Sequence, residues 1–576
     1  MFGEDMKFET KIFSIFLILC MLAGVFANSR SDESIFEDFS FFSNKTTLRV
    51  WYTDDAITPY LQSMAIKFSE KNREARVEPK LVSGMEYLEA VNKASMENKN
   101  LPDIFVTTND TLEKVYCAGL ALEADNSDGF FNKVLFPKAA LDSVTYKGKY
   151  IAYPFYFETS ALVYNKTYLE SYAKEQMEKR KKQEEEAVQQ ETALEEGEES
   201  ASEGDSAGKT EDSEKATEES SEASSEESQD DESQDEAGEE NSGEGEEGED
   251  SEGEDAEDVE IPEEDFSTEE VNEEINDILS SDFKSIQDII NFSQKYDAPE
   301  KVKSIFEWDV NDIFYNYFFV GAYMNLGGDA GDNINVDNID QDIAIYNGNT
   351  ISCMKIYKQL KQFFAIDAKE TTYDDMATRF LKGEILFTIA TTDIFKKYDE
   401  IKVKDPLTIT ADGGEYYEYA VAPAVPELPN GLKTRTMSVT NCLVVNGLSE
   451  HPDLAEKFAR MICMDEKNDI YKMSHKLAAH YGIDYGQEGL NKFVDIYADS
   501  VSMPKTIQTS NFWMELEIAF AKIWDDEDAD CNAILKELSE SIKTQVMGKE
   551  YHDQPIQDPM DTPITAGLSE EDEEGD

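Results

Sequence analysis

Near its start the chain alternates between two patterns of apolar residues. Three short runs rich in β-branched and aromatic side chains predict strands, and the two stretches between them have apolar residues at helical spacing. In chain order, beginning with a strand, these segments are residues 47–52, 57–72, 76–82, 87–97 and 102–107. Strands that alternate with helices are typical of a parallel, wound sheet. The pattern therefore predicts the α/β fold class.

Polar residues follow the first and third predicted strands directly. Asp54 and Asp55 come after the first strand, and Asp110 comes after the third. Parallel sheets bind ligands just beyond the C-terminal ends of their strands. We therefore expect Asp55 and Asp110 to contact a ligand. The structural alternative is that each caps a helix, a position that aspartate favours.

Ordered patterning continues on both sides of a long polar stretch. Residues 144–154 predict a hairpin with a Lys-Gly turn, and residues 161–166 predict a further strand. A charged helix is predicted from about Thr167 and runs into the polar stretch. The α/β-like pattern resumes near Asp282 and extends to about Met547. Both flanks therefore belong to folded structure.

The polar stretch is strongly acidic. Residues 181–270 hold 41 acidic residues against 4 lysines and one aromatic residue, Phe266. A segment so poor in apolar residues cannot bury enough surface to offset its loss of conformational entropy. We therefore predict a disordered acidic low-complexity insertion over residues 177–275, placed inside one fold because patterning flanks it. Its alternative roles are a tether, a spacer or a loose cation sponge.

Overall charge limits the classes of partner. The 576 residues carry a formal net charge of −72, about half of it in the insertion. A field of this sign repels polyanions. The composition therefore disfavours nucleic acid and anionic membrane surfaces as partners.

The two ends of the chain differ from its folded part. Residues 1–27 have the basic, apolar and small-residue regions of a signal peptide, with predicted cleavage after Ala27. Export to the periplasm or cell surface is therefore expected; an uncleaved anchor, or a lipid anchor at Cys20, is the alternative. Residues 28–45 predict a polar leader, and residues 551–576 an acidic tail.

Cysteine and histidine usage indicates neither a disulfide framework nor a metal site. The six cysteines are widely spaced and form no Cys-x-x-Cys motif, and none lies at metal-ligand spacing from one of the four histidines. One bridge remains open as an alternative. We expect no metal and no cofactor.

Three groups of segments, in this order, resemble the extracellular solute-binding proteins of sugar ABC transporters, the maltose-binding-like group. They are 102–105 with 118–122; 148–154 with Glu158 and 164–166; and 375–389 with 422–423 and 451–458. The stretch 503–519 resembles the segment in which that group presents an aromatic residue to the sugar. The similarity extends over about 480 residues.

The resemblance implies a two-lobed, periplasmic-binding-protein-like fold of type II. Lobe 1 is expected from residues 46–154 and 416–482, and lobe 2 from residues 155–415 and 483–550. The acidic insertion then enters lobe 2 after residues 164–166.

The resemblance also implies a sugar cleft, which needs carboxylates for hydroxyl groups and aromatic rings for C–H faces. Asp55, Asp110 and Glu158 match acidic positions of the family pattern, and Trp513 matches a stacking aromatic. Further candidates are Tyr153, Trp308 and Asp393. The aromatic residues of 314–323 are expected to be mainly core, with one at the cleft.

The sequence departs from the maltose-binding pattern at three places. Ala56 and Thr111 replace basic residues, and residues 391–393 read Thr-Thr-Asp where many relatives have Gly-Pro-Trp. A sugar other than maltose is therefore expected.

The expected function is a monomeric receptor that captures a mono- or oligosaccharide and delivers it to ABC permease subunits. The main alternative is the same fold binding a polyamine, a metal or a peptide. The polyamine leads this group, because aspartates and aromatic rings also suit cations. A surface scaffold or adhesin is a further alternative. An enzyme is not expected, because the chain has no nucleophile elbow, zinc-protease or phosphate-binding motif.

Overall fold

A computed structural model describes residues 45–565 with gaps. The gaps are 83, 85, 98–99, 202–266, 282, 328–333, 365, 367–370, 412–413, 423–425, 465–468 and 506–511. The predicted signal peptide, Cys20 and almost all of the leader lie outside the described residues, as does the end of the acidic tail. None of the described helices combines the length and apolar character needed to cross a membrane.

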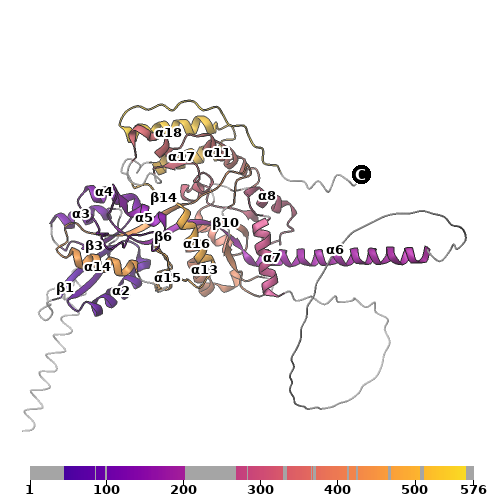
Figure 1. Ribbon diagram of the computed structural model, residues 1–576, viewed down its shortest axis with the longest axis horizontal. Coiled ribbons are helices and arrows are strands. Elements are labelled where there is room, and N and C mark those ends of the chain that lie inside the picture. Colours follow the sequence, from indigo (N-terminus) through magenta and orange to yellow (C-terminus); the bar gives the residue numbers. More distant parts are fainter. Residues whose placement is uncertain are drawn as a thin grey trace, which may run out of the picture. The chain divides into compact units, whose positions relative to one another are not determined.

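The first lobe is built on the strands predicted from the start of the sequence. β1 (Thr46–Tyr52) pairs in parallel with β2 (Ala75–Leu81) and with β3 (Ile104–Thr108). The intervening helices are α2 (Thr58–Lys71) and α3 (Tyr87–Glu97). The wound α/β pattern is therefore confirmed (Figure 1).

One long strand, β6 (Tyr153–Asn165), belongs to both lobes. Its first half pairs antiparallel with β12 (Met437–Val445), which also pairs with β3. Its second half pairs antiparallel with β10 (Ile385–Thr391) and with β11 (Tyr419–Val421). The order β2-β1-β3-β12-β6-β10-β7, which ends at β7 (Ser304–Phe306), thus runs through both lobes without a break. Because β6 carries the chain from one lobe to the other, it forms part of the hinge.

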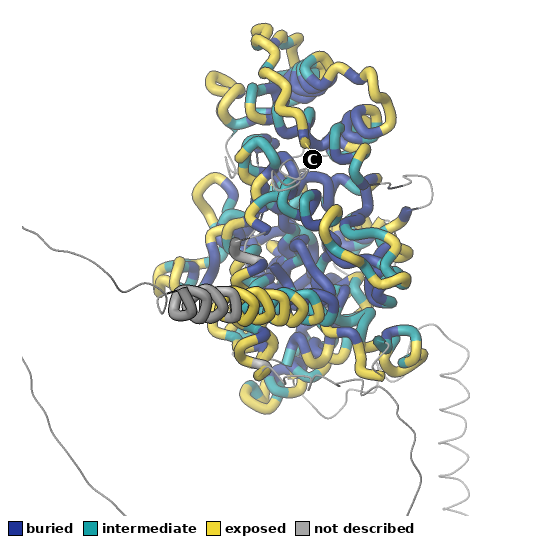
Figure 2. The backbone as a smooth tube through the Cα atoms, turned by 90° about the vertical axis from the view of Figure 1, so that its right-hand side faces the viewer, coloured by how far each residue is buried: buried dark blue, intermediate teal, exposed yellow. Residues whose placement is uncertain are grey.

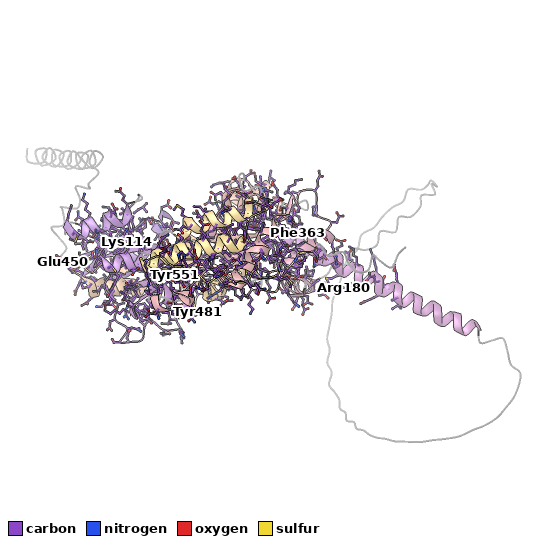
Figure 3. All side chains as sticks on the ribbon, turned by 90° about the horizontal axis from the view of Figure 1, so that it is seen from above. Lys114, Arg180, Phe363, Glu450, Tyr481 and Tyr551 are labelled. Carbon is purple, nitrogen blue, oxygen red and sulfur yellow. The ribbon has the colours of Figure 1, made fainter. Side chains whose placement is uncertain are left out.

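Helices cover both parts of this sheet, and Figure 2 shows buried residues inside and exposed residues on the outside. The other first-lobe helices are α4 (Leu112–Cys117), α5 (Lys138–Val144), α14 (Pro452–Cys463) and α15 (Asp469–Ser474). Those of the second lobe are α8 (Ile286–Lys295), α9 (Ile313–Asn316), α10 (Ile339–Asp342), α11 (Gly348–Leu360), α12 (Tyr373–Leu381), α13 (Asp393–Lys404), α17 (Phe512–Asp525) and α18 (Cys531–Met547). α16 (Glu488–Asp499) packs on β6, β11 and α5. In Figure 3, Lys114 and Glu450 mark the first lobe and Phe363 marks the second.

Short strands extend this sheet or form separate two-stranded sheets. They are β4 (Thr145–Tyr146), β5 (Lys149–Tyr150), β7 (Ser304–Phe306), β8 (Asn325–Leu326), β9 (Ile343–Ala344), β13 (Leu477–Ala478) and β14 (Val501–Ser502). β4 and β5 form the hairpin predicted within 144–154. β7 pairs in parallel with β10 and forms the edge of the sheet in the second lobe.

The pairing of β11 moves one predicted lobe boundary. Residues 416–482 are predicted to belong to lobe 1, but Tyr419–Val421 pairs with Val163–Asn165 in the second-lobe half of β6. The chain therefore returns to the first lobe between β11 and β12. The physical reason is backbone hydrogen bonding of a three-residue strand, which is too short to show a pattern in the sequence.

The described residues 174–201 and 267–271 belong to a unit separate from the rest of the chain. Helix α6 (Lys166–Ala201) continues into this unit, and α7 (Thr268–Ser281) begins at its end. The helix predicted from about Thr167 is thus confirmed, and the predicted insertion is helical at both of its ends. Glutamate, lysine, glutamine and alanine favour helix, and Lys179 adds an ion pair with Glu175, 2.6 Å, at i,i+4 spacing. The rest of the insertion lies outside the described residues.

The first part of the predicted acidic tail packs on the second lobe. The Lys543 ammonium, 2% exposed, is 2.6 Å from the Asp553 carboxylate. Lys355 lies 2.7 Å from both Asp558 and Asp561. Residues 551–565 are therefore held along the lobe by lysines of α11 and α18. The acidic residues of the predicted tail are therefore the partners of these lysines.

Candidate functional site

A cavity of about 440 Å³ lies between the two lobes. Its first-lobe wall follows the end of β1 and the middle of β6, and its second-lobe wall surrounds α9, α12 and the end of β10. The residues that line it are Asp54, Asp55, Ala56, Glu158, Val439, Ser474, His475 and Lys476 from the first side, and Asp312, Phe314, Tyr315, Tyr373, Thr391, Thr392, Asp393 and Lys396 from the second. We call this cavity the interlobe cleft.

Two adjacent aspartates on the first wall have different roles. Asp54 caps the short 3-10 helix η2 (Asp55–Ile57), because its Oδ1 accepts the Ala56 N–H at 3.0 Å. Its Oδ2 accepts the Tyr156 hydroxyl at 3.1 Å. Asp55 is exposed in the cleft, and within the described residues its carboxylate has no hydrogen-bond or ion-pair partner. Asp55 is therefore the carboxylate that remains available to a ligand.

The difference between these aspartates gives a stability prediction. Asp54→Ala removes the cap and leaves the Tyr156 hydroxyl unpaired, so we expect the free energy of unfolding to fall by about 1–2 kcal/mol. Asp55→Ala should change it by less than about 0.5 kcal/mol. Urea denaturation followed by circular dichroism measures both values. Equal losses for the two variants would contradict the roles assigned here.

A lysine pairs with two of the acidic groups of the first wall. Lys476 Nζ is 2.7 Å from Glu158 Oε1 and 3.1 Å from Asp54 Oδ2. β13 places it there by pairing Leu477 and Ala478 with β6 immediately before Glu158. Burial alone would lower the pKa of the Lys476 ammonium, but the Glu158 and Asp54 carboxylates outweigh it and raise this pKa above its ordinary value. The ammonium is therefore charged.

Aromatic rings form much of the second wall. Tyr315 and Tyr373 stack with ring centroids 4.8 Å apart and an interplanar angle of 11°. Phe314 meets Tyr315 edge-on at 5.7 Å, and its side chain is half-buried in the cleft. The wall therefore presents apolar ring surface opposite the charged groups of the first lobe.

Two carboxylates accompany these rings. Asp312 caps α9 by accepting the Phe314 N–H at 2.8 Å, and burial raises the pKa of its carboxyl group. Asp393 accepts hydrogen bonds from the hydroxyls of Tyr373 and Thr391. Acceptors beside aromatic faces suit a ligand with hydroxyl groups on its rim and C–H groups on its faces.

The structure brings three of the seven predicted site residues together: Asp55, Glu158 and Asp393 all line the cleft. Asp110 follows β3 as predicted but does not line the cleft. Burial raises the pKa of Asp110, and its Oδ1 has no hydrogen-bond partner among the described residues. Trp513 is half-buried in the first turn of α17, which packs on α9, but it too lies outside the lining.

Trp308 and Tyr153 are core residues, which corrects their assignment to the cleft. Trp308 is fully buried, and its Nε1–H donates to Asn316 Oδ1 at 3.0 Å. Tyr153 is 2% exposed and packs against Phe130 and Phe131. Both are large aromatic residues near strands, where a side chain turned toward the core has the same sequence signature as one turned toward a ligand.

Among the cleft residues missed from the sequence or predicted only as a group are Phe314, Tyr315, Tyr373, His475 and Lys476. The aromatic cluster was expected to place one ring at the cleft, and it places two, whereas Tyr317, Phe318 and Phe319 are fully buried. An aspartate cap directly before the cluster, at Asp312, was the available signal.

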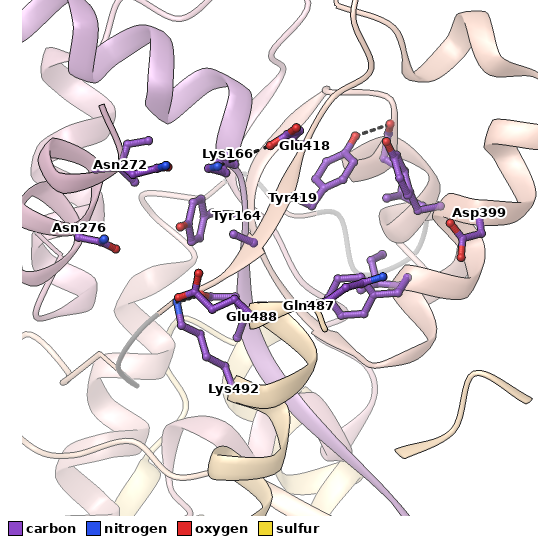
Figure 4. Close-up of a pocket in the computed structure, with 18 of the residues that line it drawn as sticks. Tyr164, Lys166, Asn272, Asn276, Asp399, Glu418, Tyr419, Gln487, Glu488 and Lys492 are labelled. Atoms are coloured by element: carbon purple, nitrogen blue, oxygen red, sulfur yellow. Dashed lines mark hydrogen bonds and ion pairs between the residues drawn. The ribbon is translucent and has the colours of Figure 1, made fainter. Parts of the chain in front are cut away.

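A larger cavity of about 600 Å³ lies mostly within the second lobe (Figure 4). Its two lysines pair with glutamates of its lining: Lys166 lies 3.5 Å from Glu418, and Lys492 lies 2.8 Å from Glu488. The Tyr419 hydroxyl donates to the Leu381 carbonyl at 2.6 Å. Because this cavity is not at the ends of the parallel strands and its charges are satisfied, the interlobe cleft is the candidate site.

Comparison with known proteins identifies the fold. No protein-family model matches the sequence, and neither does any curated protein. Solved structures match it, among them a cyclo/maltodextrin-binding protein complexed with maltotetraose, with a TM-score of 0.56, 12% identity and coverage of 88% of this chain and 98% of that chain. The extracellular solute-binding protein from Staphylococcus aureus, in complex with maltose, matches with a TM-score of 0.56 at 14% identity. The match covers 88% of this chain and 99% of that chain.

A third similar structure is the maltose-binding periplasmic protein from Listeria monocytogenes in complex with maltose. Its TM-score is 0.55 at 16% identity, and the match covers 88% of this chain and 100% of that chain. The chain therefore has the two-lobed fold of these extracellular solute-binding proteins, as the sequence resemblance predicted.

Proposed function

We propose that this protein is an exported receptor that binds a mono- or oligosaccharide in the interlobe cleft and delivers it to the permease subunits of an ABC importer. The observation that carries the proposal is the composition of the two walls. Asp55 and Glu158 stand on one lobe, and the rings of Phe314, Tyr315 and Tyr373 stand on the other. Carboxylates and rings on opposite walls match the rim and faces of a sugar.

The comparisons support the same function. Three proteins of this fold are named as binding maltose or maltotetraose. The departures at Ala56, Thr111 and residues 391–393 lead us to propose a sugar other than maltose. We also propose that the protein acts as a monomer and binds its ligand without catalysing a reaction.

In this mechanism, binding selects a closed arrangement of the lobes. A ligand that contacts both walls stabilises only the arrangement in which both sets of contacts form. β6 continues through both lobes and provides a strand about which such a change can occur. Permease subunits would then distinguish the closed, loaded receptor from the open one.

The second candidate is a receptor of the same fold for a polyamine. It is favoured by one observation: five carboxylates line the cleft, against two lysines and one histidine. Protonated amines bind between carboxylates and over aromatic rings. The two candidates therefore differ in the charge of the ligand, which a binding experiment can read directly.

A thermal-shift screen of the mature chain, residues 28–576, tests the proposal. We expect one neutral sugar in a panel of mono- and oligosaccharides to raise the unfolding temperature. At a hundredfold excess over Kd the stabilisation is about 2.7 kcal/mol. Putrescine, spermidine and calcium chloride are run beside the sugars at the same concentration. A shift with amines alone would contradict the sugar proposal and support the second candidate.

A further inference from the structure

The surroundings of Lys476 resemble a binding site for an ammonium group that the chain itself fills. Its Nζ has one carboxylate oxygen on either side, Glu158 Oε1 at 2.7 Å and Asp54 Oδ2 at 3.1 Å. It also lies 5.4 Å from the ring centroid of Tyr156. Two carboxylates and an aromatic ring are the groups that recognise a primary ammonium ion in a ligand.

From this geometry we infer that Lys476 is a specificity-determining residue: its ammonium occupies a cation subsite of the interlobe cleft and thereby selects neutral over cationic ligands. The inference rests on the proposed function and narrows its ligand class. A second ammonium at this position would meet Lys476 at short range, and like charges this close repel strongly. A neutral hydroxylated ligand meets no such repulsion.

The same lysine also fixes the carboxylates that a neutral ligand would use. Glu158 is still 40% exposed at its side chain, so one face of it remains open to the cleft. A carboxylate already paired with a lysine keeps its position when the cleft opens. Ligand binding then loses less side-chain conformational entropy, because the carboxylate is held in place beforehand. Lys476 thus weakens the binding of cationic ligands and strengthens the binding of neutral ligands that donate hydroxyl hydrogen bonds.

The other carboxylates of the cleft are poorer sites for a cation than the Lys476 subsite. Asp312 is engaged in capping α9, and Asp393 accepts two hydroxyl hydrogen bonds. Asp55 remains available, but an exposed single carboxylate is a weak site for a cation. The Lys476 subsite, in contrast, combines two carboxylates with the Tyr156 ring around one point.

Lys476→Met tests the inference, because methionine keeps most of the side-chain volume and removes the charge. Isothermal titration calorimetry measures putrescine and the sugar found in the screen against the full mature chain. We expect putrescine affinity to rise at least tenfold and sugar affinity to fall at least threefold. Lys476→Arg should keep the neutral preference. Lys138→Met removes an equal charge from an exposed ion pair with Asp142 and should change neither affinity.

The outcomes separate this inference from the proposed function. If the wild-type protein binds no sugar and Lys476→Met gains putrescine binding, the inference stands and the sugar proposal fails. If Lys476→Met is folded by circular dichroism and its putrescine affinity equals that of the wild type, the inference fails whatever the sugar result. Tight putrescine binding by the wild-type protein would overturn both.

Discussion

Trp308→Ala is expected to lower the free energy of unfolding by about 3–5 kcal/mol. The Trp308 side chain is fully buried in the second lobe. Its ring contacts Phe306, Phe319, Tyr357, Phe364 and Trp524. Alanine would leave a cavity in this cluster, because a packed core relaxes only partly around a lost ring.

A hydrogen bond adds to this loss. Asn316 is 1% exposed, and its Oδ1 accepts the Trp308 indole N–H at 3.0 Å. Its amide nitrogen donates to the Val310 carbonyl at 2.7 Å, so Asn316 holds the start of α9. Removing the indole leaves a buried acceptor with only the Tyr357 hydroxyl, at 3.3 Å.

Urea denaturation followed by far-ultraviolet circular dichroism measures the loss, and Trp513→Ala is the matched control. Trp513 is half-buried at the start of α17, so its replacement should cost less than about 1.5 kcal/mol. Trp308→Phe should recover part of the stability because it keeps a ring but no donor. If Trp308→Ala were stable yet bound ligand poorly, Trp308 would be a cleft residue after all.

The strands and helices at the start of the chain were predictable because local pattern and final pairing agree there. Residues 47–52 are β-branched and aromatic, and they form the central strand β1. The same rule placed Asp55 at the site, since a parallel sheet puts its strand ends at one edge. It failed at Asp110, because the end of β3 lies away from the cleft lining.

Lys476 and the second-wall rings could not be predicted in the same way. Lys476 is 318 residues from Glu158 in sequence, and the strand that positions it has two residues. Neither periodicity nor a motif reports such a long-range pairing. Around Phe314, a four-residue α-helix passes into a 3-10 turn, so helical spacing does not separate core-facing from cleft-facing rings.

Removing one group from each wall of the interlobe cleft should nearly abolish binding of the neutral sugar. Asp55→Ala removes a carboxylate whose hydrogen bonds to hydroxyl groups are worth roughly 1.5–3 kcal/mol. Phe314→Ala removes a ring whose stacking contributes about 0.5–1.5 kcal/mol. These residues stand on opposite walls of the cleft, in different lobes, so their effects should add. The double variant is therefore expected to bind on the order of 30- to 2,000-fold more weakly.

Isothermal titration calorimetry with the sugar from the screen gives the affinities, and Glu74→Ala with Phe363→Ala is the control pair. Glu74 is exposed and Phe363 is half-buried, and neither lines the cleft, so this pair removes the same charge and ring without touching the site. A decisive feature is additivity. If binding uses both walls at once, each single variant should retain weak binding. The loss of binding free energy in the double variant should then equal the sum of the losses in the two single variants. A loss confined to one single variant would instead mean that the ligand rests on one lobe, and closure of the cleft around it would have to be abandoned.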